Sequence, residues 1–216
     1  MNIVIIGAGG HGRVVLDILR LRNEVQVAGF IDADLSRAGT NLDGVPILGP
    51  VNMLPRLRRG DVRGAIVAVG DNRVRLSYAR EAAAAGLELI SAVHPAAVVS
   101  PSAGVGANVV VAAGAVVAAG ARVADSAIIN TGAVVDHECD IGTGAHVCPG
   151  ALLAGRVRVE EGAFVGLGAH VLPCRKIGAW AVVGAGAVVI EDVPAGATVV
   201  GVPARIIRVE RGGATA

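Results

Sequence analysis

The second half of the sequence repeats with a period of six residues, and few folds accommodate such a pattern. Stepping by six from Val93 to Val189 gives 17 positions, all of them Val, Ile or Leu. The position four residues further on is Ala at 12 of the 17 steps. This register predicts a three-sided parallel β-helix, in which each hexapeptide forms one strand and one turn and three complete a coil. The aliphatic residue points inward, and neighbouring Gly supplies the positive φ that turns often require.

The composition supports a thin, repetitive interior. The chain has 216 residues, of which only 2% are aromatic, and 31 are Gly. With 17% charged and 53% hydrophobic residues, the sequence is not that of a disordered protein. Lys plus Arg is 19 and Asp plus Glu is 18, a net charge of +1 that argues against a nucleic-acid binder driven by phosphate neutralisation.

Nothing in the sequence favours export or a membrane span. The first residues lack the basic region of a signal peptide. Residues 103–121 carry no charge over 19 positions, but four glycines, Asn108 and the period of six argue against a membrane helix. Three cysteines, Cys139, Cys148 and Cys174, show no CxxC spacing and are typical of reduced thiols. We therefore expect a cytoplasmic protein.

The first third of the chain has the alternation of a Rossmann-like α/β domain. An apolar strand at residues 3–6 is followed by Gly7-Ala8-Gly9-Gly10-His11-Gly12, a G-x-G-x-x-G motif between a strand and a helix. A second strand, 25–31, ends at Asp32, where dinucleotide folds place a ribose-binding acid. A third strand, 65–69, ends at Gly70, and a helix at 73–85 and a strand at 87–93 follow.

This pattern predicts a truncated domain of about four strands over residues 1–92, followed by the solenoid and its C-terminal tail over residues 93–216. Backbone N–H groups at a helix N-terminus bind phosphate or pyrophosphate. The Gly motif alone therefore leaves NAD and a nucleotide-sugar as alternative ligands.

His137 is the strongest catalytic candidate. It lies two positions after the inward residue Val135, so its side chain is expected to project outward, with Asp136 and Glu138 beside it. An imidazole next to a carboxylate is held in one tautomer and becomes a better general base. A zinc site like that of γ-type carbonic anhydrases would need His137, His146 and His170 to converge, and their spacings of 9 and 24 residues give no such convergence. We therefore expect no metal.

Taken together, these motifs resemble the nucleotide-sugar acyltransferases of the PglD/NeuD type over essentially the whole chain. The landmarks are Gly7–Gly12, Phe30-Ile31-Asp32, Val69-Gly70-Asp71-Asn72, Asn130-Thr131, Asp136-His137-Glu138-Cys139 and Val200-Gly201-Val202-Pro203-Ala204. The resemblance implies a Rossmann-like domain followed by a left-handed parallel β-helix. It also implies a homotrimer that binds acetyl-CoA in clefts between neighbouring prisms.

The resemblance further implies a role for individual residues. Gly9, Gly10, His11, Asp32 and Gly70 would bind the nucleotide-sugar. His137 would be the general base, and Glu138 would raise its basicity. His146, Gly155, Leu167 and Ala185 would line the acetyl-CoA cleft. Some relatives carry a second acid after Asp32, where this chain has Ala33, so the resemblance does not carry over the contact to the base or ribose, while the implied chemistry is unaffected.

The implied activity is transfer of acetyl from acetyl-CoA to the 4-amino group of a UDP-linked amino-dideoxy sugar in glycan biosynthesis. The transfer would be direct, because no Ser or Cys stands beside His137 as a nucleophile, and inward Cys139 is expected to pack. The alternatives are O-acetylation of a sialic-acid-type sugar and a non-catalytic nucleotide-sugar scaffold. An NAD-dependent oxidoreductase is disfavoured because no hydride-handling residues are visible.

Overall fold

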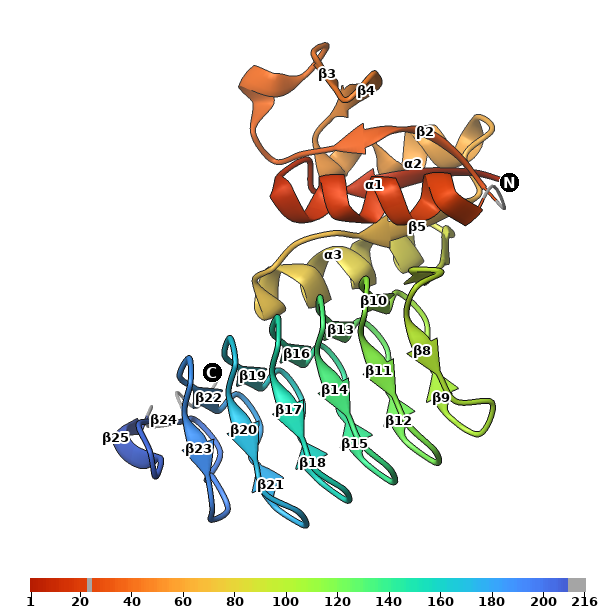
Figure 1. The fold of residues 1–216 in the computed structure, drawn as a ribbon. Coiled ribbons are helices and arrows are strands. Elements are labelled where there is room, and N and C mark those ends of the chain that lie inside the picture. The colour runs from red at the N-terminus through yellow and green to blue at the C-terminus, as the bar shows by residue number, and fades with distance from the viewer. Residues whose placement is uncertain (23–24, 210–216) are drawn as a thin grey trace. The chain divides into compact units, whose positions relative to one another are not determined.

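The computed structural model describes residues 1–22 and 25–209, which form two compact units (Figure 1). Among the described residues, the first unit comprises residues 1–95 and 107–110, and the second comprises residues 96–106 and 111–209. We retain the boundary between residues 92 and 93 as a proposal, because the period of six begins there.

The first unit is built on a six-stranded sheet in the order β3-β4-β2-β1-β5-β6. All neighbours in it are parallel except the pair β3 and β4. The strands are β1 (Asn2–Ile6), β2 (Gln26–Ile31), β3 (Asn41–Leu42), β4 (Val45–Gly49), β5 (Gly64–Val67) and β6 (Glu88–Leu89). The expectation of about four strands was too low, because the hairpin β3–β4 carries no clear alternation in its few residues.

Three helices accompany this sheet: α1 (Gly10–Arg22), α2 (Leu54–Arg59) and α3 (Asn72–Ala84). Helix α3 begins where the Asp71 carboxylate accepts a hydrogen bond from the Val74 N–H (2.9 Å), which satisfies one of the open donors of its first turn. The strand expected at 87–93 is divided into β6 and the short strand β7 (Ala92–Val93).

The second unit is a left-handed parallel β-helix with three faces (Figure 1). Face 1 contains β10 (Val110–Val111), β13 (Ile128–Ile129), β16 (His146–Val147), β19 (Phe164–Val165), β22 (Val182–Val183), β24 (Ala197–Val200) and β25 (Arg205–Val209). Face 2 contains β8 (Val98–Val99), β11 (Val116–Val117), β14 (Val134–Val135), β17 (Leu152–Leu153), β20 (His170–Val171) and β23 (Val188–Val189). Face 3 contains β9 (Gly104–Val105), β12 (Arg122–Val123), β15 (Asp140–Ile141), β18 (Arg158–Val159) and β21 (Lys176–Ile177).

The predicted inward positions form the core of this solenoid. From Val111 to Val189, each aliphatic residue of the six-residue series is at most 2% exposed. Strands pair in register with those 18 residues away, as in Val117 with Val135, so equivalent side chains stack on one another. The segment 103–121 therefore forms the strands β9, β10 and β11, and no helix of the described residues is long and apolar enough to cross a membrane.

The corners of the prism contain columns of residues with positive φ. One column consists entirely of glycine: Gly114, Gly132, Gly150, Gly168 and Gly186. The column between faces 2 and 3 is different, because after Gly120 it continues with Glu138, Arg156 and Cys174, whose φ values are 56°, 61° and 60°. A non-glycine residue is unfavourable in this conformation, so these side chains occupy positions where glycine would fit better.

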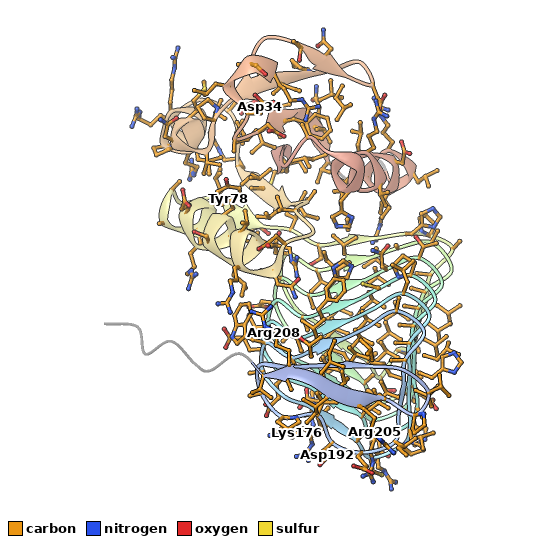
Figure 2. The ribbon with its side chains drawn as sticks, turned by 90° about the vertical axis from the view of Figure 1, so that its left-hand side faces the viewer. Asp34, Tyr78, Lys176, Asp192, Arg205 and Arg208 are labelled. Carbon is orange, nitrogen blue, oxygen red and sulfur yellow. The ribbon has the colours of Figure 1, made fainter. Side chains whose placement is uncertain are left out.

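The C-terminal end of the solenoid is closed by an antiparallel pairing of β24 with β25. Nearby, the Lys176 N–H donates a hydrogen bond to the Asp192 carboxylate (3.0 Å), and both side chains are labelled in Figure 2.

Candidate active site

His137 and Glu138 lie side by side on the corner between faces 2 and 3. The His137 Nδ1 is 3.3 Å from Glu138 Oε2, and both side chains are more than half exposed. The His137 backbone N–H donates to the Asp136 carboxylate (2.7 Å), which fixes the start of the turn. When Nδ1 carries the proton and donates to Glu138, Nε2 keeps its lone pair and can accept a proton from a substrate.

The ring of His137 lies directly over Gly155 of the next coil. A Cβ built on Gly155 would be 2.3 Å from His137 Nε2 and 2.5 Å from Cε1, closer than any real contact. The corner is held together by a hydrogen bond from the Arg156 N–H to the His137 carbonyl (2.9 Å). The absence of a side chain at Gly155 thus sets where the imidazole can lie.

Glu138 has a second partner that the sequence prediction missed. Arg156, 18 residues further on and in the same column, donates from Nε to Glu138 Oε2 (2.9 Å). This hydrogen bond, followed by that from His137, lowers the pKa of Glu138 below its usual value. Glu138 is therefore a stable carboxylate across the neutral pH range.

Of the four residues expected to line an acetyl-CoA cleft, three lie on two different corners and His146 lies on face 1. Gly155 is beneath His137, on the corner between faces 2 and 3. Leu167 and Ala185 are exposed and stack 18 residues apart on the corner between faces 1 and 2, where the Gly186 N–H donates to the Leu167 carbonyl (2.7 Å). His146, on β16 of face 1, is only 8% exposed.

His146 is packed into its surroundings. Its Nε2 lies 3.1 Å from Asn130 Nδ2, and its ring meets Phe164 edge-on with centroids 5.2 Å apart. A single chain therefore brings His137 and Gly155 together on one corner. Leu167 and Ala185 lie on the corner at the opposite edge of face 2, and His146 lies on face 1.

The glycine motif of the first unit divides into structural and open positions. Gly7 has φ 108°, and a Cβ there would be 2.7 Å from the Ala68 carbonyl oxygen; a Cβ on Gly12 would be 2.2 Å from the Gly7 carbonyl oxygen. These two glycines permit the tight turn and the close packing of α1. Gly9, Gly10 and Gly70 have nothing within 4 Å of such a Cβ, so their backbone borders open space.

The open glycines occupy the place where an α/β sheet binds its ligands. The chain passes from β1 to β2 on one side and continues through β5 on the other, so the strand order reverses between β1 and β5. Gly9 and Gly10 follow β1, and Gly70 follows β5, at the carboxyl ends of these strands. Ligands bind at this crevice in open parallel sheets, with phosphates at the helix N-terminus.

Asp32 already has backbone partners at the end of β2. Its Oδ2 accepts from the Ala8 N–H (2.7 Å), its Oδ1 accepts from the Asp34 N–H (2.9 Å), and Arg37 Nη1 lies 3.4 Å from Oδ2. The carboxylate thus holds the glycine loop in place, a role the sequence prediction did not include. Its contact with a ribose stays a prediction.

His11 lies in the first turn of α1, and the buried cation Arg75 influences it. Its Nε2 is buried and has no hydrogen-bond partner among the described residues. Burial, and to a smaller extent the charge of Arg75, lowers the pKa of His11 to about 4. Arg75 itself is fully buried and donates to the carbonyls of Val69 (2.8 Å) and Gly70 (3.2 Å), so it holds the turn after β5.

The neutral state of buried His11 predicts a loss of stability in acid. In the unfolded chain His11 binds a proton near its ordinary pKa of 6.5, whereas in the folded chain it does so only near pH 4. The stabilising effect is therefore fully present above pH 6.5 and is lost as pH falls toward 4, by about 2–3 kcal/mol in the free energy of unfolding. Denaturant unfolding of the wild type and of His11→Gln across this range measures it. An equal pH dependence in both proteins would refute the assignment.

The three cysteines are free thiols. Cys139 points inward as expected and donates from Sγ to the Ala154 carbonyl (3.2 Å). Burial raises the pKa of Cys148 to about 12, and that of Cys139 is raised by the same cause, so neither is a nucleophile. Within the described ranges, no group of three or more His, Cys, Asp or Glu side chains is placed to hold a metal ion.

Two arginines were missed because their roles depend on tertiary structure. Arg75 is one of several arginines in its helix, and its burial has no sequence signal. Arg156 could have been found by applying the 18-residue coil spacing to Glu138 as well as to the inward residues.

Comparison with known proteins extends these observations. Residues 2–82 match the family model of the PglD N-terminal domain. UDP-N-acetylbacillosamine N-acetyltransferase of Bacillus subtilis (strain 168) is 40% identical over 100 residues, which span 45% of each chain. The aligned part is thus less than half of that relative.

Solved structures cover nearly the whole chain. PerB of Caulobacter crescentus, in complex with CoA and GDP-perosamine, is 46% identical with a TM-score of 0.92, covering 96% of this chain and 98% of its own. The acetyltransferase domain of PglB from Neisseria gonorrhoeae, in complex with acetyl coenzyme A, is 38% identical with a TM-score of 0.86, covering 95% and 98%. Two further structures of the Caulobacter enzyme carry a single histidine replaced by Asn or by Ala.

Proposed function

Because this chain belongs to the PglD-type family of nucleotide-sugar N-acetyltransferases, we propose that it acetylates the amino group of a nucleotide-linked amino-dideoxy sugar with His137 as general base. The observation that carries this proposal is the pair of His137 and Glu138 on an exposed corner, with the imidazole placed over Gly155. This arrangement leaves one imidazole nitrogen with a lone pair facing away from its carboxylate partner.

The chemistry requires no covalent intermediate on the enzyme. The sugar nitrogen attacks the thioester carbonyl, a C–N bond forms, and His137 Nε2 accepts the proton that the nitrogen loses. The C–S bond then breaks, and coenzyme A leaves as the thiol with a proton returned by the imidazolium. Holding both large substrates in one orientation supplies much of the acceleration.

The first unit would hold the nucleotide-sugar at the crevice between β1 and β5. The backbone N–H groups of Gly9 and Gly10 at the start of α1 would face the pyrophosphate, with Gly70 opposite and His11 and Asp32 at the edges. These residues are proposed contacts, based on the open space at the three glycines.

The proposal also concerns which nucleotide the acceptor sugar carries. The expectation of a UDP-linked sugar agrees with the name of the Bacillus subtilis relative, whereas the more extensive similarity is to a protein solved with GDP-perosamine. GDP-perosamine is therefore the first acceptor to test, and a UDP-linked 4-amino sugar is the second.

Release of the coenzyme A thiol from acetyl-CoA tests the function. The panel contains UDP-, GDP- and dTDP-linked 4-amino-dideoxy sugars and a free sialic acid. Turnover with a 4-amino sugar supports the proposal and identifies the nucleotide. Turnover only with sialic acid would replace it by O-acetylation. A folded protein that binds acetyl-CoA but acts on none would favour the scaffold alternative.

We further propose a homotrimer, with face 2 at its centre. The outward residues of this face are apolar in five of six strands: Val98, Val116, Val134, Leu152 and Val188, with His170 the exception. Val98 is 63% and Leu152 is 40% exposed. A row of exposed apolar side chains along one face is typical of a protein–protein interface. Packing three such faces together would bring His137 and Gly155 of one chain toward Leu167 and Ala185 of the next.

Sedimentation equilibrium measures the assembly. We expect a mass of three chains for the wild type and a smaller mass for Leu152→Asp, because a charge would be buried without a partner. The matched variant Arg122→Asp, on face 3, should remain trimeric. A wild type that sediments as one chain while fully active would contradict the trimer.

A further inference from the structure

Arg156 occupies a corner position with positive φ, a backbone conformation in which glycine is the least strained residue. Its φ is 61°, and the same column has Gly120 two coils earlier. A long cationic side chain at positive φ is unfavourable to the backbone. Its ion pair with Glu138 does not compensate by stabilising the fold, because both side chains are more than half exposed and water screens such pairs. The stability of the solenoid therefore gives no reason for an arginine here.

The geometry gives a different reason. Arg156 Nε and His137 Nδ1 converge on one oxygen atom, Oε2 of Glu138, at 2.9 and 3.3 Å. The backbone N–H of Arg156 also donates to the carbonyl of His137 (2.9 Å). Arg156 thus contacts both members of the pair, and its side chain restricts where the Glu138 carboxylate can lie.

Relying on His137 as the base of the proposed function, we infer that Arg156 is a positioning residue that fixes the Glu138 carboxylate against His137 Nδ1. Without Arg156, the exposed Glu138 carboxylate would sample other rotamers, and its contact with the imidazole would be lost for part of the time. With it, the Nδ1–H tautomer is maintained and Nε2 is held over Gly155.

The charged groups that contact this pair come from two successive turns of the column. The Asp136 carboxylate accepts from the His137 backbone N–H, Glu138 Oε2 lies against His137 Nδ1, and Arg156 Nε donates to Glu138. Arg156 is the one cation among these contacts, and it reaches the imidazole through the Glu138 carboxylate.

The test is a double-mutant cycle in which kcat and KM are measured separately. Arg156→Gln should lower kcat about tenfold with little change in KM, because the Glu138 carboxylate would lie against His137 for only part of the time. Arg156→Lys keeps a cationic donor beside the carboxylate and should recover part of the lost kcat. In the Glu138→Gln background, Arg156→Gln should have almost no further effect on kcat, because the two residues act through one contact. Arg122→Gln, an exposed arginine on face 3, is the matched control and should behave as wild type.

Two outcomes would overturn the inference. One is an unchanged kcat in Arg156→Gln. The other is an equally large effect of Arg156→Gln with and without Glu138, which would mean that the guanidinium contacts a ligand directly. Both leave the proposed function intact, because that depends on turnover by the wild type and its loss in His137→Ala. Circular dichroism of each variant separates these results from loss of folding.

Discussion

Replacing His137 with Ala should lower kcat for acetyl transfer by about 10³-fold, since general-base catalysis by a positioned imidazole contributes 10²–10⁴ in rate. The residual rate would come from holding the two substrates together. The KM values should change little, because a general base acts on the proton that moves in the transition state and does not hold the bulk of either substrate. Steady-state thiol release measures kcat for both proteins.

Thr143→Ala is a suitable control for this variant. Thr143 is an exposed turn residue only six positions along the chain, and its backbone carbonyl keeps the hydrogen bond from the Gly162 N–H (2.9 Å). It should retain wild-type rates. A His137→Ala protein with near-wild-type kcat would remove the catalytic assignment, whatever the control shows.

Gly155→Ala should lower kcat by about 10²-fold without unfolding the solenoid. The new Cβ would be 2.3 Å from His137 Nε2, so the imidazole must leave its place over the glycine. A displacement of about 1 Å at a reacting group costs rate on this scale. The φ of Gly155 is outside the positive range, so the backbone itself accepts alanine.

A second glycine gives the control for this substitution. Gly104, on β9, also has a φ outside the positive range, and a Cβ there would be 4.0 Å from the Arg122 side chain, an ordinary contact. Gly104→Ala should leave kcat and thermal stability unchanged. If Gly155→Ala retained full activity with a normal melting temperature, the position of the His137 ring would not matter for catalysis.

The solenoid could be predicted because its signal is repeated many times. From Val111 onward, each aliphatic residue of the series that begins at Val93 is buried, as predicted. Every coil has the same space for an inward side chain at the same spacing, so the pattern recurs. The hairpin of β3 and β4 was missed for the opposite reason. Its strands are short, β3 having only two residues, and Asn41–Gly49 contains no stretch long enough for alternation to be visible.

The candidate site was predictable in part. The outward direction of His137 followed from counting positions after Val135, and the pairing with Glu138 followed from adjacency. The contact of Arg156 with Glu138 joins residues 18 apart, and the contact of Asp32 with Ala8 joins residues 24 apart. Such contacts depend on side-chain rotamers and on the pitch of the coil, which a linear reading does not supply.

N-acetylation of the sugar is tested by NMR of the product that the wild-type protein forms from acetyl-CoA and GDP-perosamine, which locates the acetyl group. We predict an amide on the sugar nitrogen, with one coenzyme A thiol released for each sugar modified. An acetyl ester on a sugar hydroxyl, or thiol release with the sugar unchanged, would contradict the account.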